Sequence, residues 1–322
     1  MEQSTPEMIC LTDGHAGNRR QALALAHALG FPSAPHVDLA PGALARLWAP
    51  RRFPGAARAF GPAFRAVLEP PPALAIGCGR QSALATRLLR EAGSRVIQIL
   101  DPRIDPRYWD RVIVPRHDRL QGANVIALSG SLNEIDDLWL ARARSDFPAI
   151  GTLPGPRVAL LVGGPGKHWT MDDAAFLAVL RELAESVAAR GGSLLASGSR
   201  RTPPAWREAL RGSGAAIRWC DEGDGPNPYR GVLAWADAIV CTADSVNMLS
   251  EASATQVPVH VLGEARLQGR PRMFLDELIT RSRVRPFTAA LAPFPGTPLR
   301  ETARVAGELQ PWLATALATP VR

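Results

Sequence analysis

Short apolar runs alternate with helical patterns along this chain, and this alternation restricts the folds that it can adopt. The pattern predicts a first series of strands and helices, with strands at 8–11, 35–39, 73–77, 95–100, 111–114 and 123–128 and helices that include 19–29 and 81–92. It predicts a second series, with strands at 157–163, 192–197, 215–219, 237–241 and 258–262 and helices at 171–190, 203–211, 245–254 and 272–281. Strands that alternate with helices of about ten residues or more form βαβ units on parallel sheets, so we expect an α/β fold.

A stretch rich in proline and glycine separates the two series. Residues 145–156 have no amphipathic period and contain Pro148, Pro154 and Pro156, which is typical of a linker. With 322 residues, the chain is also too long for one ordinary core. We therefore expect two Rossmann-like domains, at 1–148 and 149–322.

The charge of the chain favours an anionic partner. The formal net charge is +7 and the sequence pI is about 10.2, which fits nucleic acid, a nucleotide, phosphate or anionic lipid. Codon bias with a solvated basic surface explains the general basicity equally well. Lys167, however, is the one lysine among 37 Lys and Arg residues.

The cysteines and the apolar runs indicate a cytoplasmic protein. The four cysteines (Cys10, Cys78, Cys220 and Cys241) lie on or beside apolar runs without C-x-x-C pairing, so we expect buried thiols in a reducing compartment and no metal site. We find no signal peptide and no apolar stretch near the roughly 18 residues of a membrane span.

The turn GGPGKHW at 163–169 follows a predicted strand and precedes a helix. Glycines let backbone N–H groups approach an anion, and Lys167 adds a positive charge, so Gly163, Gly164, Gly166 and Lys167 are candidate phosphate ligands. The turn is not a Walker A loop, because His168 stands where that motif has Ser or Thr. The alternative is a tight turn that needs glycine for positive φ.

Two further turns of the second series carry groups that bind anions or sugars. After strand 192–197, the candidates for an anion cradle are Ser197, Ser199 and Arg200, with capping residues beside exposed arginines as the alternative. After strand 237–241, Ser245 and Asn247 lie at a helix start and can donate to phosphates, and Glu251 can accept the two hydroxyls of a ribose. The alternative there is an ordinary capped helix with a surface glutamate.

In the first series, the turn TDGHAGN at 12–18 is the candidate for proton transfer. Asp13 and His15 are suited to acid–base work near neutral pH. An acceptor or phosphate would be held by the polar turn around them, formed by Gly14, Gly17, Asn18 and Arg19. An N-capped helix with a partly exposed histidine is the alternative.

Three other features of the first series stay open. GCGRQS at 77–82 is a degraded G-x-G-x-x-G pattern and supports a rival dehydrogenase or epimerase interpretation. His117 and Asp118 form a second candidate acid–base pair. Residues 42–68 contain five arginines, no acid and interleaved aromatics, which indicates either an anionic membrane surface as partner or core packing with solvated arginines.

Three segments together resemble a known family. LTDGHAGNRRQALALA, LLVGGPGKHW and NPYRGVLAWADAIVCTADSVNMLSEA are similar to the mitochondrial-fission "elongated mitochondria" family and its bacterial relatives, some of which carry a nucleoside-diphosphate-sugar epimerase label. The resemblance spans about residues 8 to 290. It implies a GT-B-like fold, with two Rossmann-like domains facing across a cleft, a donor in the C-terminal domain and an acceptor near the N-terminal one.

The resemblance also implies roles for particular residues. Glu251 would hold the ribose, Ser245 and Asn247 would lie at the diphosphate, and Gly163 to Lys167 would line the cleft. The helix expected at 301–317 would pack back on the N-terminal domain. Plant members are associated with recruiting the fission machinery to the mitochondrial surface, which is a scaffold role.

Three functions are therefore compared. The first is metal-independent transfer from a nucleoside-diphosphate sugar to an unknown acceptor, with no cofactor besides that donor and no nucleic-acid partner. The second is a non-catalytic adaptor for a membrane or a partner, placed in the cytoplasm or peripherally at the inner membrane. The third is a nucleoside-diphosphate-sugar epimerase.

Overall fold

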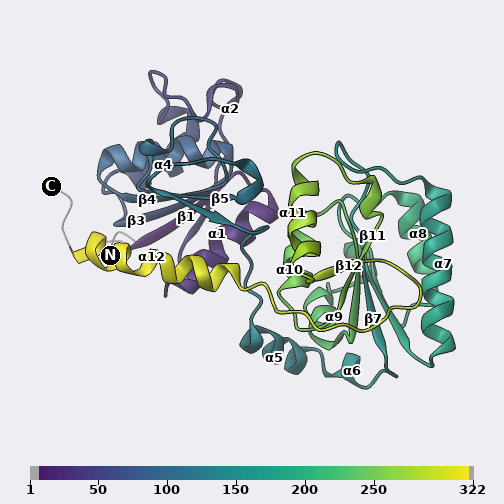
Figure 1. The fold of residues 1–322 in the computed structure, drawn as a ribbon. Coiled ribbons are helices and arrows are strands. Elements are labelled where there is room, and N and C mark those ends of the chain that lie inside the picture. The colour runs from purple at the N-terminus through teal and green to yellow at the C-terminus, as the bar shows by residue number, and fades with distance from the viewer. Residues whose placement is uncertain (1–6, 319–322) are drawn as a thin grey trace. The chain divides into compact units, whose positions relative to one another are not determined.

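The computed structural model describes residues 7–318 and divides into two compact units, each built on a six-stranded parallel sheet (Figure 1). The first unit consists of the described residues up to Glu134 and those from Glu301 onward, and the second unit is Ile135–Arg300. The predicted α/β class with two Rossmann-like domains is confirmed. No helix in the described part of the chain is long and apolar enough to cross a membrane.

The sheet of the first unit has the strand order β2-β1-β3-β4-β5-β6. Its strands are β1 (Met8–Thr12), β2 (His36–Asp38), β3 (Leu74–Cys78), β4 (Arg95–Ile99), β5 (Arg111–Pro115) and β6 (Val125–Leu128). Its helices are α1 (Ala16–Ala28), α2 (Ala43–Trp48), α3 (Gly61–Leu68), α4 (Arg80–Ala92) and α12 (Glu301–Ala318).

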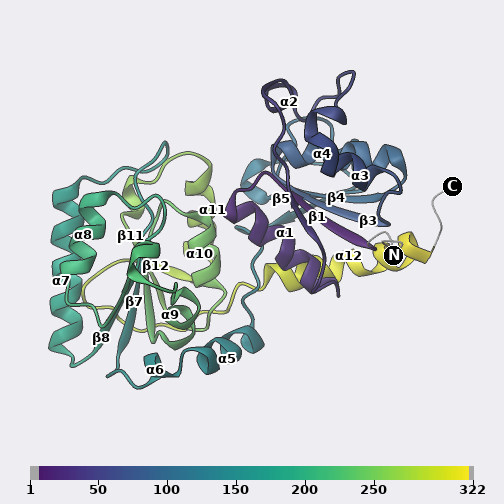
Figure 2. The same ribbon diagram turned by 180° about the vertical axis from the view of Figure 1, so that it is seen from behind.

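Side chains that alternate along these strands fill two cores. On one face, Cys10 and Ile76 pack with Leu25 of α1 and Leu309 of α12. Helices α3 and α4 cover the other face (Figure 2). There Ile9 and Leu11 of β1 pack with Phe64 and Leu84. Period-two alternation in buried strands therefore produces the three-layer arrangement.

The sheet of the second unit has the order β12-β11-β10-β7-β8-β9. Its strands are β7 (Arg157–Leu161), β8 (Ser193–Ser197), β9 (Ile217–Trp219), β10 (Ala238–Thr242), β11 (Val259–Leu262) and β12 (Val284–Pro286). Its helices are α5 (Asp137–Asp146), α6 (Pro148–Gly151), α7 (Asp173–Ala189), α8 (Pro204–Gly212), α9 (Tyr229–Trp235), α10 (Val246–Ser253) and α11 (Arg270–Thr280).

The stretch predicted as a linker, 145–156, contains structure. It includes the end of α5 and all of α6, and both helices pack on α9. Arg144 donates from Nε to the Ala234 carbonyl at 2.8 Å, and Trp235 Nε1 donates to the Phe147 carbonyl at 2.9 Å. The second unit therefore begins at Ile135, ahead of the predicted boundary after residue 148, and α12 belongs to the first unit.

Arg283 closes the C-terminal end of α10 from inside the second unit. Its side chain is buried and donates to four backbone carbonyls, those of Ala252, Ser253, Thr255 and Val257, at 2.8–3.2 Å. A helix leaves its last carbonyls without partners, and a guanidinium has five donors in a fixed fork, so Arg283 adds donors to the last two carbonyls of α10 and reaches two carbonyls beyond the helix. This contact fixes the helix whose opposite end carries Ser245 and Asn247.

His260 on β11 is a buried titratable group whose ring nitrogens form no hydrogen bond of ordinary geometry within the described residues. It is 2% exposed, and within the described residues neither ring nitrogen has a partner at hydrogen-bonding distance, although the Pro286 backbone lies close enough to favour the charged form weakly. Phe294 packs edge-on against the ring, with centroids 5.4 Å apart. Burial, followed by the charge of Arg285, lowers the pKa of His260 below its usual 6.5.

This burial predicts acid sensitivity. A histidine whose pKa is lowered by folding stabilises the protein above pH 6.5, and this stability is lost as the pH falls below that value, because the unfolded chain then binds the extra proton. As the pH falls below 6.5, the free energy of unfolding of the wild type should decrease more steeply than that of His260→Leu, by at most about 1.4 kcal/mol per pH unit. Urea unfolding at several pH values measures the difference. Parallel pH profiles for the two proteins would contradict it.

Candidate functional site

The carboxyl edge of the second sheet collects the residues predicted from its turns. Strands β11, β10, β7 and β8 are neighbours and all parallel, so the turns that follow them meet at one edge of the sheet. Ligands of open α/β sheets bind at this edge. The predicted residues that the topology brings together there are Gly163, Gly164, Gly166, Lys167, Ser197, Ser199, Arg200, Ser245, Asn247 and Glu251.

Asp244 connects three of these strand ends and was not among the predicted site residues. Its carboxylate is 2% exposed; Oδ2 accepts from the Gly164 amide at 3.1 Å and from Arg201 Nη2 at 2.5 Å. Oδ1 accepts from the Thr242 hydroxyl at 2.6 Å, and that hydroxyl accepts from the Gly163 amide at 2.8 Å. One buried carboxylate therefore holds the turns after β7, β8 and β10 together.

This network explains two glycines of the 163–169 turn. A Cβ on Gly163 would collide with the carboxylate of Asp244, and one on Gly164 would collide with the Arg201 carbonyl. Neither glycine has positive φ, so the tight-turn alternative does not account for them. Because their amides already donate to Thr242 and Asp244, they support the turn and leave little capacity to bind an anion.

The tip of this turn presents Lys167. The Gly166 amide donates to the Trp169 carbonyl at 2.8 Å, which closes a tight turn with Lys167 and His168 at its tip. Trp169 is buried and donates from Nε1 to the Gly263 carbonyl at 2.8 Å, so the turn is anchored to the end of β11. Lys167 is exposed and forms no ion pair within the described residues. Its ammonium is free to bind an anion.

The turn after β8 uses most of its hydroxyls internally. Ser197 is buried, and the Ser199 hydroxyl lies 3.2 Å from both the Arg201 amide and the Thr202 hydroxyl. No side chain caps α8, so the capping alternative does not hold. Arg201 is paired with Asp244, whereas Arg200 is exposed and forms no ion pair within the described residues.

Helix α10 carries the remaining candidates. Ser245 is its N-cap and accepts from the Met248 amide at 3.3 Å, and Asn247 is half-buried in the first turn. Glu251 is only 6% exposed, so it is not the surface glutamate of the alternative interpretation. Its Oε2 accepts from the Tyr229 hydroxyl at 2.6 Å, which orients the carboxylate.

The carboxyl edge of the first sheet holds the predicted proton-transfer pair. His15 Nδ1 lies 3.0 Å from Asp13 Oδ1, and the imidazole is 75% exposed while the carboxylate is 12% exposed. Asn18 Nδ2 donates to the same carboxylate oxygen at 2.9 Å. Asp13 therefore contacts Nδ1 of a largely exposed imidazole, which is an arrangement suited to a general base.

The rest of the predicted acceptor side lies on the same turn. Gly14 has φ +79°, a conformation that favours glycine, and Gly17 and Arg19 lie in the first turn of α1. Gly79 of the degraded dinucleotide pattern lies against this turn, since a Cβ there would approach Asn18 Nδ2 and Asp13 Oδ2 within 3 Å. That glycine makes room for the Asp13 cluster, and this weakens the dinucleotide interpretation.

A second polar cluster beside it was missed from the sequence. The Thr12 hydroxyl donates to Asp38 Oδ1 at 2.8 Å and lies 2.9 Å from His36 Nε2. Burial is the main cause that lowers the pKa of His36, with Asp38 opposing it and Arg19 adding to it. The only sequence signal was the H-x-D spacing on a short strand. His117 and Asp118 follow β5, and β3 and β4 separate them from β1.

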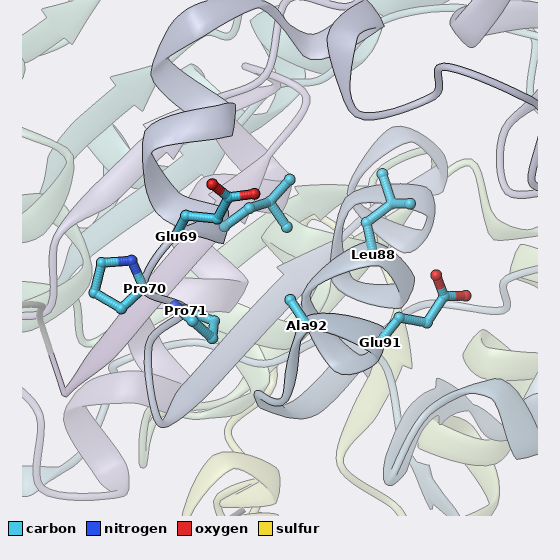
Figure 3. Close-up of a pocket in the computed structure, with 7 residues that line it drawn as sticks. Glu69, Pro70, Pro71, Leu88, Glu91 and Ala92 are labelled. Atoms are coloured by element: carbon cyan, nitrogen blue, oxygen red, sulfur yellow. The ribbon is translucent and has the colours of Figure 1, made fainter.

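An open cavity of about 640 Å³ in the first unit lies away from these groups. It is lined by Leu68, Glu69, Pro70, Pro71, Leu88, Glu91 and Ala92 (Figure 3). These residues come from the end of α3, the segment that follows it before β3, and the end of α4. Within the described residues, no group of three or more His, Cys, Asp or Glu is arranged to hold a metal ion.

Comparison with known proteins identifies similar chains. The family model described as Mitochondrial fission ELM1 matches residues 16–313. Mitochondrial fission protein ELM1 of Arabidopsis thaliana is 31% identical over 277 residues, which cover 76% of this chain and 64% of that protein. The chain thus spans less than two thirds of the length of this plant relative.

Solved structures show the same fold. Spinosyn forosaminyltransferase SpnP has a TM-score of 0.53 at 12% identity, with 98% of this chain and 100% of that chain covered. Os79 from O. sativa, in complex with UDP, has a TM-score of 0.50 at 12% identity, with 96% and 93% covered. The fold of the chain is therefore that of GT-B glycosyltransferases.

Proposed function

The chain belongs to the mitochondrial fission ELM1 family. We propose that it transfers a sugar from a nucleoside-diphosphate donor, which its second unit binds. One observation carries the proposal. At the carboxyl edge of one sheet, an unpaired Lys167 accompanies a capped helix start at Ser245 and a buried, oriented carboxylate at Glu251. These are the groups that a diphosphate and a ribose require.

The diphosphate end of the donor would be held by positive charge. Lys167 supplies an ammonium, Arg200 supplies a guanidinium, and the first turn of α10 supplies the positive end of the helix dipole together with the Asn247 amide. Gly163, Gly164 and Gly166 take the supporting role that their internal contacts indicate. Os79 is a structural neighbour with UDP bound, which supports a nucleotide in this fold.

The ribose would be held by Glu251. A buried carboxylate accepts hydrogen bonds from adjacent hydroxyls, and the bond from Tyr229 fixes its plane. Glu251 and Tyr229 would thereby fix the position of the nucleotide along the edge of the sheet, with its phosphates toward the start of α10.

The chemical step needs a base and a stabilised leaving group. We assign deprotonation of the acceptor hydroxyl to His15, oriented by Asp13, with the proton passing to Nε2. The acceptor oxygen then bonds to the anomeric carbon, and the bond from that carbon to the diphosphate oxygen breaks. Lys167 and the α10 start stabilise the charge on the departing diphosphate, so the proposal needs no metal and no cofactor besides the donor.

A thermal-shift panel of nucleoside diphosphates and nucleoside-diphosphate sugars tests the donor site. A ligand at 100 times its Kd adds about 2.7 kcal/mol of stability. Lys167→Ala should weaken binding by about tenfold or more, because a hydrogen bond to a charged group contributes roughly 1.5–3 kcal/mol. Glu251→Gln should weaken the binding of nucleotides that have an intact ribose. It should leave the binding of inorganic pyrophosphate unchanged.

The matched control is Arg142→Gln, which removes an exposed charge on α5 of the same unit that has no ion-pair partner in the described part of the chain. It should bind nucleotide like the wild type. A panel in which no compound raises the melting temperature would contradict the donor site and leave the adaptor as the better explanation. Interconversion of free nucleoside-diphosphate sugars without any acceptor would instead support an epimerase.

The adaptor alternative is kept because one surface of the first unit has the character of a docking site. Residues 43–65 combine exposed apolar side chains with arginines.

A further inference from the structure

The end of α2 exposes two large apolar side chains in succession. Leu47 is 71% exposed and Trp48 is 49% exposed, and few large apolar side chains of the described chain are comparably open. The helix stands at one end of the first unit (Figures 1 and 2). An apolar pair at this degree of exposure costs solvation energy, and clusters of this kind mark interaction sites.

The exposed pair is held in a fixed conformation. Arg80, at the start of α4, donates from Nη2 to the Leu47 carbonyl at 2.6 Å and from Nε to the Ala49 carbonyl at 2.5 Å. Arg87, about two turns further along α4, donates to the Pro50 carbonyl at 2.9 Å. Two side chains of a core helix thus satisfy the carbonyls at the end of α2, so the apolar pair is presented on a rigid support.

The segment that contains this pair is rich in positive charge, and most of its arginines have no acidic partner within the described residues. Residues 42–68 contain five arginines and no acid. Arg51, Arg58 and Arg65 are exposed, and within the described residues they form neither ion pairs nor side-chain hydrogen bonds. Arg52 is paired with Glu91 at 3.0 Å, and Arg46 donates to the Pro41 carbonyl.

We propose that this surface, formed by Leu47, Trp48, Arg51, Arg58 and Arg65, docks the protein on an anionic lipid bilayer. Tryptophan and leucine enter the boundary between headgroups and acyl chains, and arginine stems lie along it while their guanidinium groups bind lipid phosphates. Charge complementarity selects this partner, because Arg51, Arg58 and Arg65 are exposed and have no acidic partner within the described residues. The docking goes beyond the proposed sugar transfer and does not depend on it, since vesicle binding needs no nucleotide.

Co-sedimentation with vesicles tests the docking. The wild type should bind vesicles of phosphatidylcholine with phosphatidylglycerol and should bind pure phosphatidylcholine at least tenfold more weakly, with affinity for the anionic vesicles falling as salt rises. Arg51→Gln/Arg58→Gln/Arg65→Gln should bind the anionic vesicles about a hundredfold more weakly, at roughly fivefold per arginine. Leu47→Ser/Trp48→Ser should lose about tenfold or more, because it removes the apolar insertion.

A matched control separates this surface from the general basicity of the chain. Arg142→Gln/Arg181→Gln/Arg218→Gln removes three exposed arginines of the second unit that have no partner within the described residues. It changes the net charge by the same amount as the triple variant of the docking surface. It should keep at least a third of the wild-type affinity. Equal losses in the two triple variants, full binding by Leu47→Ser/Trp48→Ser, or equal binding to neutral and anionic vesicles would each overturn the proposal. All these side chains are exposed, and unchanged melting temperatures would show that the variants fold.

Discussion

Arg283→Met is expected to lower the free energy of unfolding by about 3–5 kcal/mol, which is in the range for breaking a buried charged hydrogen-bond network. The guanidinium donates to the carbonyls of Ala252, Ser253, Thr255 and Val257, and methionine can satisfy none of them. Burial, together with nearby Arg300, lowers the pKa of Arg283 to about 10, so the group is still charged at neutral pH. Its charge then lies at the negative end of the α10 dipole, where a cation is favourable.

Urea unfolding at pH 7 measures this loss. Arg281→Met is the matched control, because Arg281 is exposed and its ion pair with Glu277 spans one turn of α11. Exposed pairs of this kind contribute about 0.3–0.5 kcal/mol. A loss below about 1 kcal/mol for Arg283→Met would mean that water replaces the guanidinium at these carbonyls.

The second large effect is expected at His15. His15→Ala should lower the rate of sugar transfer by a factor of about 10² to 10⁴, the usual contribution of a general base. Because His15 lies on the first unit and the proposed donor site on the second, the Kd for nucleoside diphosphate should not change. Release of nucleoside diphosphate from the donor sugar, followed with acceptor present, measures the rate, and thermal shift measures the Kd.

Two further variants accompany this experiment: one is a control, and the other tests the role of Asp13. His27→Gln changes an exposed histidine at the other end of α1 and should transfer at the wild-type rate. Asp13→Asn should also slow transfer, since the amide no longer favours the imidazolium that forms on His15. If His15→Ala transfers sugar at the wild-type rate while Lys167→Ala does not, the assignment of His15 as the general base is wrong and another group has that role.

Most of the fold could be predicted because its elements are regular. Most strands of the two sheets are short buried runs and the long helices have a clear period, so the expected ranges agree with the structure to within three residues. Most of the missing elements are short, although α5, with ten residues, was not predicted either. Helices α2, α6 and α9 have four to seven residues, and β12 has three, too few for a period to show.

The return of the chain to its first unit could not be derived from periodicity. Helix α12 packs on Cys10 and Ile76 through Val305 and Leu309, and these partners are almost the whole chain apart. Only the resemblance to GT-B proteins predicted such a helix. The unit boundary differs for a similar reason, because α5 is placed by α9, which lies much later in the sequence.

The sequence located the turns of the site but not their internal organisation. It identified Gly163 and Gly164 as anion ligands, whereas the structure uses them to accommodate Asp244 and the Arg201 backbone. These contacts join turns that lie some 40 and 80 residues apart in the chain, so no local pattern reveals them. The bond from Tyr229 to Glu251 is equally non-local, although both residues lie in the segment that resembles the family.

Hydrogen exchange of the full chain tests the central claim most directly. With the nucleoside diphosphate that shifts the melting temperature most, amides in 163–169, 199–202 and 244–251 should exchange more slowly than in the free protein. Lys167→Ala should remove this protection at the same nucleotide concentration. Protection confined to other parts of the chain, or none at any of the three turns with any nucleotide in the panel, would contradict a donor site on the second unit.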